Sequence, residues 1–289
     1  MVLRRGLSTL KYLATTEVHT FAFSVAANAI LSLFPFMVLV LWLVRYVFHS
    51  PMMADAFRQF ISDHLLIGDV DQHFVIRNLN WAVTAHHRVK IASIIMLLIT
   101  SSGVFLPLEV AFNRIWGFAK NRSYIGNQLI SFLLAVASGC LVLISVGVAA
   151  GHESLLTFLL QGHAGIVLKG VMFVVLKIFA GMASVAIFFL IYWLLPNGKV
   201  RARTVLPAAV AMGILWELGK YVYMLVLPWL NFQEVYGPFY ISVTLVFWAF
   251  ISGLLVLAGA HLAAGPAVEI GSSDHRVTGT SEDRLPKMP

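Results

Sequence analysis

The chain has 289 residues and a net charge of +7, with 60% apolar residues and only 11% Asp, Glu, Lys and Arg. A soluble domain carries about 25% charged residues, so this composition excludes an ordinary soluble enzyme and indicates a polytopic membrane protein. The positive charge is explained by Lys and Arg retained on the cytoplasmic side of a membrane. Basic residues interleaved with exposed aromatic residues, as a nucleic-acid groove needs, do not occur, so we expect no nucleic-acid partner.

Six apolar runs are each long enough to form a membrane-spanning helix, because crossing about 30 Å of hydrocarbon takes about 20 helical residues. They lie near residues 24–46, 90–111, 127–150, 169–195, 204–228 and 238–264. Pro196, Asn197 and Gly198 predict a tight turn between the fourth and fifth runs. The predicted fold class is therefore all-α, a polytopic transmembrane helical bundle of about six spans.

The basic residues between these runs predict how the chain is oriented. Lys and Arg gather in the N-terminal segment, after the second and fourth spans and in the C-terminal tail, whereas the loop after the fifth span has none. By the positive-inside rule, both termini should be cytoplasmic. The expected domains are a cytoplasmic N-terminal segment (1–23), a six-helix membrane domain (24–264) with an outer loop near 47–89, and a disordered cytoplasmic tail (265–289).

The outer loop contains one amphipathic stretch, residues 54–66. Phe57, Phe60, Ile61 and Leu65 recur there at helical spacing, which predicts a short helix lying over the outer face. A covering cap is the plainer interpretation, and a gate or a partner-docking surface is the alternative.

The stretch 97–123 begins as a membrane helix and ends as a charged amphipathic surface. Pro107 removes a backbone donor and should kink the helix where the polar residues begin. Glu109, Asn113 and Arg114 follow it and form one candidate group. A cytoplasmic vestibule for an anionic headgroup is the functional interpretation. The alternative is that Arg114 simply extends to the lipid headgroups.

Glu217 and Lys220 are the sharpest candidate pair. They lie near the middle of the fifth predicted span, and residues three apart share a helix face and can pair. A lone carboxylate at the bilayer centre costs about 2.5–3.5 kcal/mol on insertion scales, so such groups usually face the bundle or a wet cavity. The two interpretations are an ion pair that fastens helices and a transport or headgroup-binding site. Lys177 is a second candidate partner for Glu217, and we expect Trp216 and Tyr221 to line the same cavity.

Four groups of residues carry a family resemblance. In chain order they are 26–35 (AANAILSLFP); 108–117 (LEVAFNRIWG); 195–197 with 206–207 and 215–220 (LPN, LP, LWELGK); and 236–237 with Trp248 and 259–260. Together they resemble the YihY/BrkB family of bacterial inner-membrane proteins, formerly labelled the ribonuclease BN family. The resemblance implies a six-helix protein of the bacterial cytoplasmic (inner) membrane and supplies no biochemical activity. The chain departs from the pattern at Asn28, Ala208 and His261, and His261 stands where an acidic residue is common.

Sequence motifs of catalysis are missing. No His-x-x-x-His with a neighbouring acid, Walker A loop or G-x-S-x-G elbow occurs. Metal-dependent cleavage of RNA needs clustered carboxylates or histidines that hold ions, whereas the acidic residues of the soluble segments lie mostly in the first loop. We therefore expect no enzyme, no ribonuclease, no cofactor and no metal.

The expected function is a transporter or lipid-flippase-like factor in envelope biogenesis, with membrane lipids as partners, because polar groups at the midplane usually mark a pathway. The substrate-pathway candidates are Glu217, Lys220, Lys177, Glu109, Asn113 and Arg114. The alternative is a non-catalytic membrane scaffold that docks other envelope proteins on its outer loop and tail.

Overall fold

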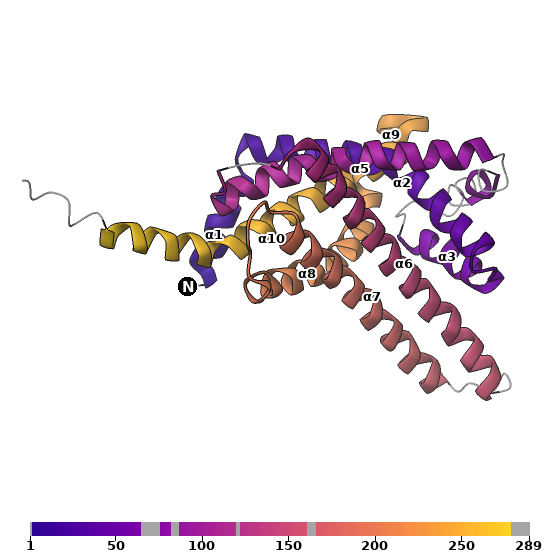
Figure 1. Ribbon diagram of the computed structural model, residues 1–289. Coiled ribbons are helices and arrows are strands. Elements are labelled where there is room, and N and C mark those ends of the chain that lie inside the picture. The colour runs from indigo at the N-terminus through magenta and orange to yellow at the C-terminus, as the bar shows by residue number, and fades with distance from the viewer. Residues whose placement is uncertain (1, 65–75, 82–86, 120–121, 161–165, 279–289) are drawn as a thin grey trace, which may run out of the picture.

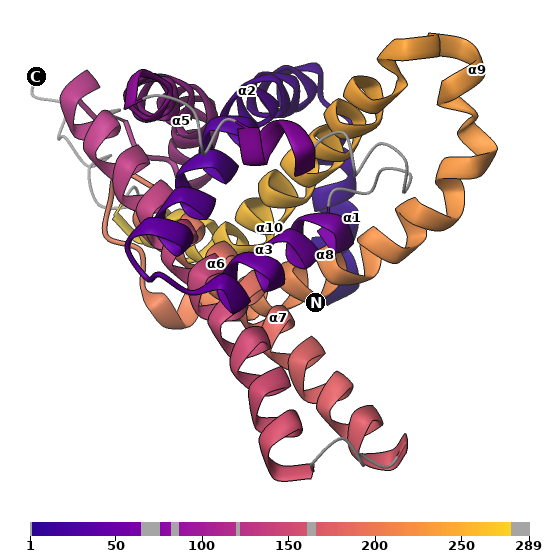
Figure 2. The same cartoon turned by 90° about the vertical axis from the view of Figure 1, so that its right-hand side faces the viewer.

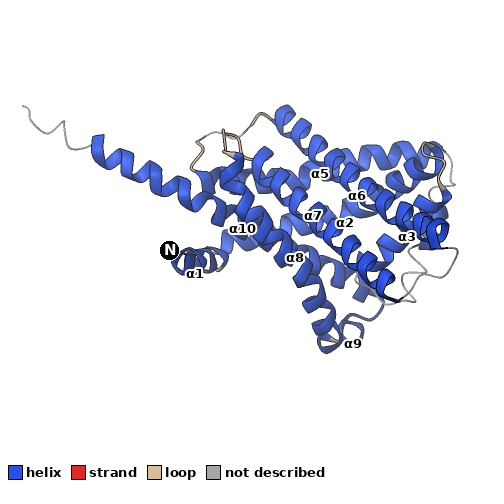
Figure 3. Cartoon of the chain, turned by 90° about the horizontal axis from the view of Figure 1, so that it is seen from below, coloured by secondary structure: helices blue, strands red, loops and turns tan. Residues whose placement is uncertain are grey.

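The computed structural model describes residues 2–64, 76–81, 87–119, 122–160 and 166–278. Throughout these ranges the regular structure is helical and no strand is present, which confirms the all-α class (Figure 3).

Figure 1 shows the arrangement of the described helices. In chain order they are α1 (Val2–Leu13), α2 (Thr16–Tyr46), α3 (Pro51–His64), a short helical stretch at 76–81, α5 (His87–Trp116), α6 (Tyr124–Leu160), α7 (Ile166–Leu194), α8 (Ala202–Leu230), α9 (Phe232–Tyr236), the 3-10 turn η1 (Gly237–Phe239) and α10 (Tyr240–Thr278).

Five helical segments among the described residues are long and apolar enough to cross a membrane. They are Thr16–Tyr46, Tyr124–Val148, Lys177–Leu194, Ala202–Leu230 and Phe232–Gly265.

The remaining predicted span, 90–111, lies inside α5. This helix has 30 residues, more than the roughly 20 that hydrocarbon requires. Its Ile91, Ile95 and Ile99 side chains are exposed, as lipid-facing residues are. Each of the six predicted spans therefore falls on its own long helix, and the turn predicted at 196–198 separates α7 from α8.

The helices pack as a bundle with one projecting hairpin. Helix α2 packs against α5 and α10, and α8 packs against α7 and α10. Helices α6 and α7 form an antiparallel hairpin whose connected ends extend beyond the other helices (Figure 2). The bundle thus brings α2, α5, α7, α8 and α10 around a shared interior.

The buried apolar side chains form two clusters. The larger cluster includes Phe112, Tyr192 and Leu257, from α5, α7 and α10. The smaller one lies beneath α3, where Phe57 and Ile61 are buried against α2 and α6. The amphipathic helix predicted within 54–66 is therefore confirmed as α3. Phe60 and Leu65 lie outside the described side chains.

One expectation stays open and another differs from the structure. Pro107 lies inside the continuous helix α5, and the kink predicted there stays a prediction. The tail, predicted to be disordered from residue 265, is helical as far as Thr278. Extending an existing helix adds one hydrogen bond for each residue fixed, which lets α10 continue beyond its apolar span. Residues 279–289 lie outside the described ranges, and the cytoplasmic placement of both termini stays a prediction.

Helix α10 packs closely against its neighbours at Gly259. A Cβ atom at this position would lie 2.1 Å from the Tyr192 hydroxyl oxygen and 2.4 Å from Cγ of Met212. The Tyr192 ring cannot move aside easily, because it is fully buried and lies against Phe112 and Phe188. Close packing at this point therefore requires glycine.

We predict that Gly259→Ala lowers the melting temperature of the purified protein in detergent, because overpacking a filled core costs about 1–3 kcal/mol. The matched control is Gly181→Ala in α7, where an added Cβ meets no atom within 4 Å. This control should keep or raise the melting temperature, since Ala is the better helix former. Equal melting temperatures for the two variants would contradict the packing argument.

Candidate functional site

An ion pair lies near the middle of the 29-residue helix α8. Nζ of Lys220 is 2.7 Å from Oε2 of Glu217, and the two side chains are only 10% and 20% exposed. The pairing predicted from their spacing is therefore confirmed. A charge away from water is strongly destabilising unless it is paired and hydrogen-bonded, so each of these side chains needs the other.

The neighbouring helix α7 supplies the second partner of the carboxylate. Oγ of Ser184 lies 2.5 Å from Oε1 of Glu217 and 3.2 Å from the carbonyl oxygen of Ala180. The single hydroxyl proton goes to the carboxylate, because a charged acceptor makes the stronger hydrogen bond. Both oxygens of Glu217 are thus engaged, and the pair also fastens α8 to α7.

An aromatic ring lies beside the ammonium end of the pair, and further rings pack against it. Nζ of Lys220 lies 4.7 Å from the centre of the Trp216 ring, within cation–π range. Nε1 of Trp216 donates to Oγ of Ser252 on α10 at 3.0 Å. The ring centre of Trp248 lies 5.9 Å from Trp216 and 5.1 Å from Tyr223. These contacts connect the charged pair to helix α10.

An apolar cavity of about 380 Å³ lies on the other side of that aromatic contact. Helices α2, α3, α5, α7 and α10 contribute to its wall, and Ser252 is the one hydroxyl side chain among the lining residues. Trp248 and Ser252 belong to the cavity wall and also contact Trp216. A continuous set of contacts therefore runs from the apolar cavity to the ion pair.

Lys177, the second candidate partner, lies on α7. Its Nζ atom is 5.9 Å from the centre of the Tyr221 ring on α8. The pairing of Lys177 with Glu217 stays a prediction.

The second candidate group binds the end of α5 to two loops. Oε1 of Glu109 accepts the backbone N–H of Arg122 at 2.9 Å, and Nδ2 of Asn113 lies 3.5 Å from the same oxygen. Oδ1 of Asn113 accepts the backbone N–H of Asn197 at 2.8 Å. Glu109 and Asn113 are each 1% exposed. These bonds hold the loop after α5 and the turn after α7 in place.

Arg122 completes this group, although sequence reasoning treated it only as a topology signal. Its guanidinium donates to the carbonyl oxygens of Leu194, Leu195 and Pro196 at 3.0, 2.9 and 2.9 Å. Helix C-termini leave carbonyls without partners, and a cation there also opposes the negative end of the helix dipole. The only sequence signal for this anchoring role would have been the position of Arg122, a basic residue 13 positions after Glu109.

Arg114 turns away from Glu109 and Asn113. It pairs with Glu17 on α2 and lies 60% exposed, with its guanidinium carbon 5.9 Å from the Phe21 ring centre. The three residues of the predicted group therefore divide between an interior network and an exposed ion pair. The cytoplasmic vestibule for an anionic headgroup, which these residues suggested, stays a prediction.

His261, which departs from the family pattern, joins α10 to the N-terminal helix. Its Nδ1 atom is 3.0 Å from Oγ1 of Thr9, and its ring stacks on Tyr12 at 4.6 Å. Burial, with a smaller contribution from Glu17, raises the pKa of the Tyr12 hydroxyl to about 12. Tyr12 is therefore uncharged where it covers His261.

The chain matches the family model described as "Virulence factor BrkB" over residues 9–277. It is 29% identical to a UPF0761 membrane protein of Chromohalobacter salexigens over 61% of this chain and 42% of the relative. It is 27% identical to one of Acinetobacter baylyi over 65% and 44%, and 23% identical to one of Aromatoleum aromaticum over 89% and 62%. The chain thus spans less than two thirds of the length of these relatives. No solved structure matches it.

We predict that Arg122→Ala destabilises the protein by about 2–3 kcal/mol, because three carbonyls lose a charged donor. Thermal or denaturant unfolding in detergent measures this loss. Arg114→Ala is the matched control, since it removes an exposed ion pair that contributes little. Comparable losses in both variants would contradict the anchoring role of Arg122.

Proposed function

The chain belongs to the BrkB family of membrane proteins, and we propose that it transports an amphipathic lipid, as a flippase-like factor of the bacterial inner membrane. One observation carries this proposal: the apolar cavity is joined by Trp248 and Trp216 to the Glu217–Lys220 pair. Such a site offers an apolar volume for an acyl chain next to paired charges for a headgroup.

The ion pair suits a zwitterionic headgroup. Lys220 and Glu217 neutralise each other at 2.7 Å. A lipid that carries a phosphate and an amine can take over both partners at once, phosphate on Lys220 and amine on Glu217. This exchange leaves no charge uncompensated at the centre of the membrane, where an unpaired charge is strongly destabilising. The Trp216 ring stays beside the ammonium in either state.

The cavity suits an acyl chain. Its volume of about 380 Å³ falls within the range of 300–1,000 Å³ typical of small-molecule sites. Almost every lining side chain is apolar, and each methylene moved from water to such surroundings contributes about 0.8 kcal/mol. Since the sequence has no ATPase motif, uphill movement would take its energy from an ion gradient or a partner protein.

We propose inner-membrane placement with both termini in the cytoplasm. The support is the distribution of Lys and Arg, which favours the N-terminal segment and the loops after the second and fourth spans.

We predict that Glu217→Gln and Lys220→Met each slow the movement of a fluorescent phospholipid in proteoliposomes by about tenfold or more, because the unpaired partner can no longer exchange with a headgroup. Glu234→Gln and Lys199→Met are the matched controls, since both residues are exposed and lie outside α8. The controls should retain the rate of the unaltered protein.

A double variant, Glu217→Gln with Lys220→Met, separates transport from folding. Removing both charges avoids a lone buried charge, so this variant should fold well and still fail to move lipid. Full lipid movement in a folded double variant would limit the pair to fastening helices. No movement in any correctly inserted sample, the unaltered protein included, would contradict the lipid transporter and favour the scaffold alternative.

We predict that Ala249→Phe also slows lipid movement, because the larger side chain occupies the cavity that Ala249 lines. The same measurement applies, with Ala211→Phe on the exposed side of α8 as the matched control. Unchanged movement in Ala249→Phe would show that the lipid does not use this cavity.

A further inference from the structure

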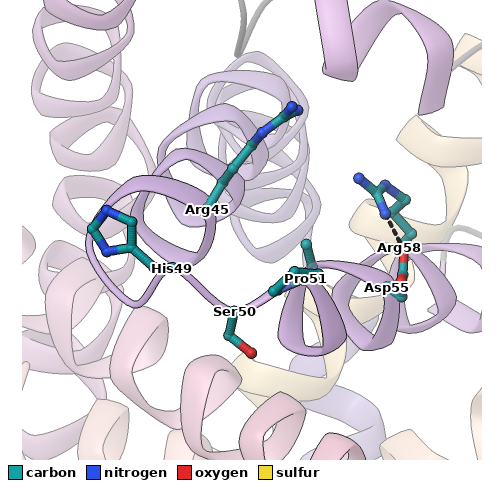
Figure 4. A pocket seen from close by; sticks show the side chains of 7 residues that line it. Arg45, His49, Ser50, Pro51, Asp55 and Arg58 are labelled. Carbon is teal, nitrogen blue, oxygen red and sulfur yellow. Dashed lines mark hydrogen bonds and ion pairs between the residues drawn. The ribbon is translucent and has the colours of Figure 1, made fainter.

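A second cavity lies at the junction of α2 and α3, far along the chain from the ion pair. Its volume is about 240 Å³, and Arg45, His49, Asp55 and Arg58 supply its ionisable lining (Figure 4). The proposed transport site uses none of these residues. Two guanidinium groups therefore line one small cavity.

The turn between the helices sets how these side chains lie. His49 has a positive φ of 50°, which turns the chain sharply after α2. The backbone N–H of Met53 then donates to Oγ of Ser50 at 3.2 Å, which caps the start of α3. As a result Arg45, in the last turn of α2, and Arg58, on α3, extend on the same side of the junction (Figure 4).

Positive charge exceeds negative charge in this cavity. Asp55 pairs with Arg58, whereas the described contact of the Arg45 guanidinium is with the Tyr46 ring, at 6.0 Å. Within the described residues, Nε of Arg58 is buried without a hydrogen-bond partner. The N-terminus of α3 adds a positive partial charge beside them. The lining thus carries one carboxylate for two guanidinium groups.

Neighbouring aromatic residues indicate the depth of the cavity in the membrane. Trp42 and Tyr46 stack at 6.2 Å at the end of α2 that carries Arg45. Trp and Tyr concentrate where hydrocarbon meets the headgroups. The exposed side chains of Val47 and Phe48 extend the apolar surface up to the turn. This pattern favours a position for the cavity near the lipid headgroups.

We propose that this cavity binds a phosphate-type oxyanion, with the guanidinium groups of Arg45 and Arg58 as its donors. Arginine matches the geometry of phosphate, and charge-assisted hydrogen bonds of this kind are strong. The depth of the cavity favours the phosphate of an anionic phospholipid over free phosphate. This site is independent of the proposed transport site, because it lies at the end of α2 and shares no residue with it.

The test counts lipids that stay bound to the full chain after its release from nanodiscs, by native mass spectrometry. Nanodiscs of phosphatidylcholine alone are compared with nanodiscs that also contain phosphatidylglycerol. The unaltered protein should retain phosphatidylglycerol, and Arg45→Gln should retain it about tenfold less, as the loss of one charge-assisted bond implies. Arg203→Gln, at an exposed arginine near the start of α8, is the matched control and should change nothing.

Asp55→Asn supplies a variant that should gain binding. It removes the carboxylate that competes for Arg58, so it should retain more phosphatidylglycerol than the unaltered protein. A parallel titration with inorganic phosphate, followed by Trp fluorescence, distinguishes the two sources. Binding of free phosphate that is lost in Arg45→Gln, without a lipid preference, supports the oxyanion site and assigns it to a soluble anion. Equal retention in all variants, together with no effect of phosphate, would overturn the proposal.

Discussion

Every charge carried into the membrane must find its partner inside the protein, because hydrocarbon offers no water to solvate it. Glu217 shows this constraint clearly. One of its carboxylate oxygens pairs with Lys220, and the other accepts a hydrogen bond from Ser184. Lys220 in turn lies against the Trp216 ring. Glu217 thereby joins α8 to α7, and Trp216, beside Lys220, joins α8 to α10.

The same constraint acts differently at the end of α5. There Glu109 and Arg122 bind backbone groups of the loop and of the turn after α7, so their partners are fixed parts of the fold. Glu217 and Lys220 instead contact the side chains of Ser184 and Trp216, and Trp216 contacts residues that line an apolar cavity. Side-chain partners can be exchanged for a ligand. This difference explains why we assign structural anchoring to the first group and lipid handling to the second.

Part of the candidate site could be predicted from the sequence. The spacing of Glu217 and Lys220 predicts their contact, because a helix repeats every 3.6 residues, and that contact is present. Ser184 and Ser252 could not be predicted, since they come from other helices and serines are common in membrane spans. Arg122 was likewise missed as a structural residue, because its guanidinium binds carbonyls more than 70 residues away in the chain.

The sequence by itself determined the membrane class, the long apolar helices, the turn at 196–198 and the helix in the first loop. Each of these depends on composition or on local periodicity, and both can be recognised from residues that are close together in the sequence. Only the tertiary structure decided that Glu109 and Arg114 point to different partners, that α10 continues to Thr278, and that Trp248 joins a cavity to the ion pair. Contacts between helices depend on how the helices pack and cross, and no local pattern records the partner that a side chain will meet.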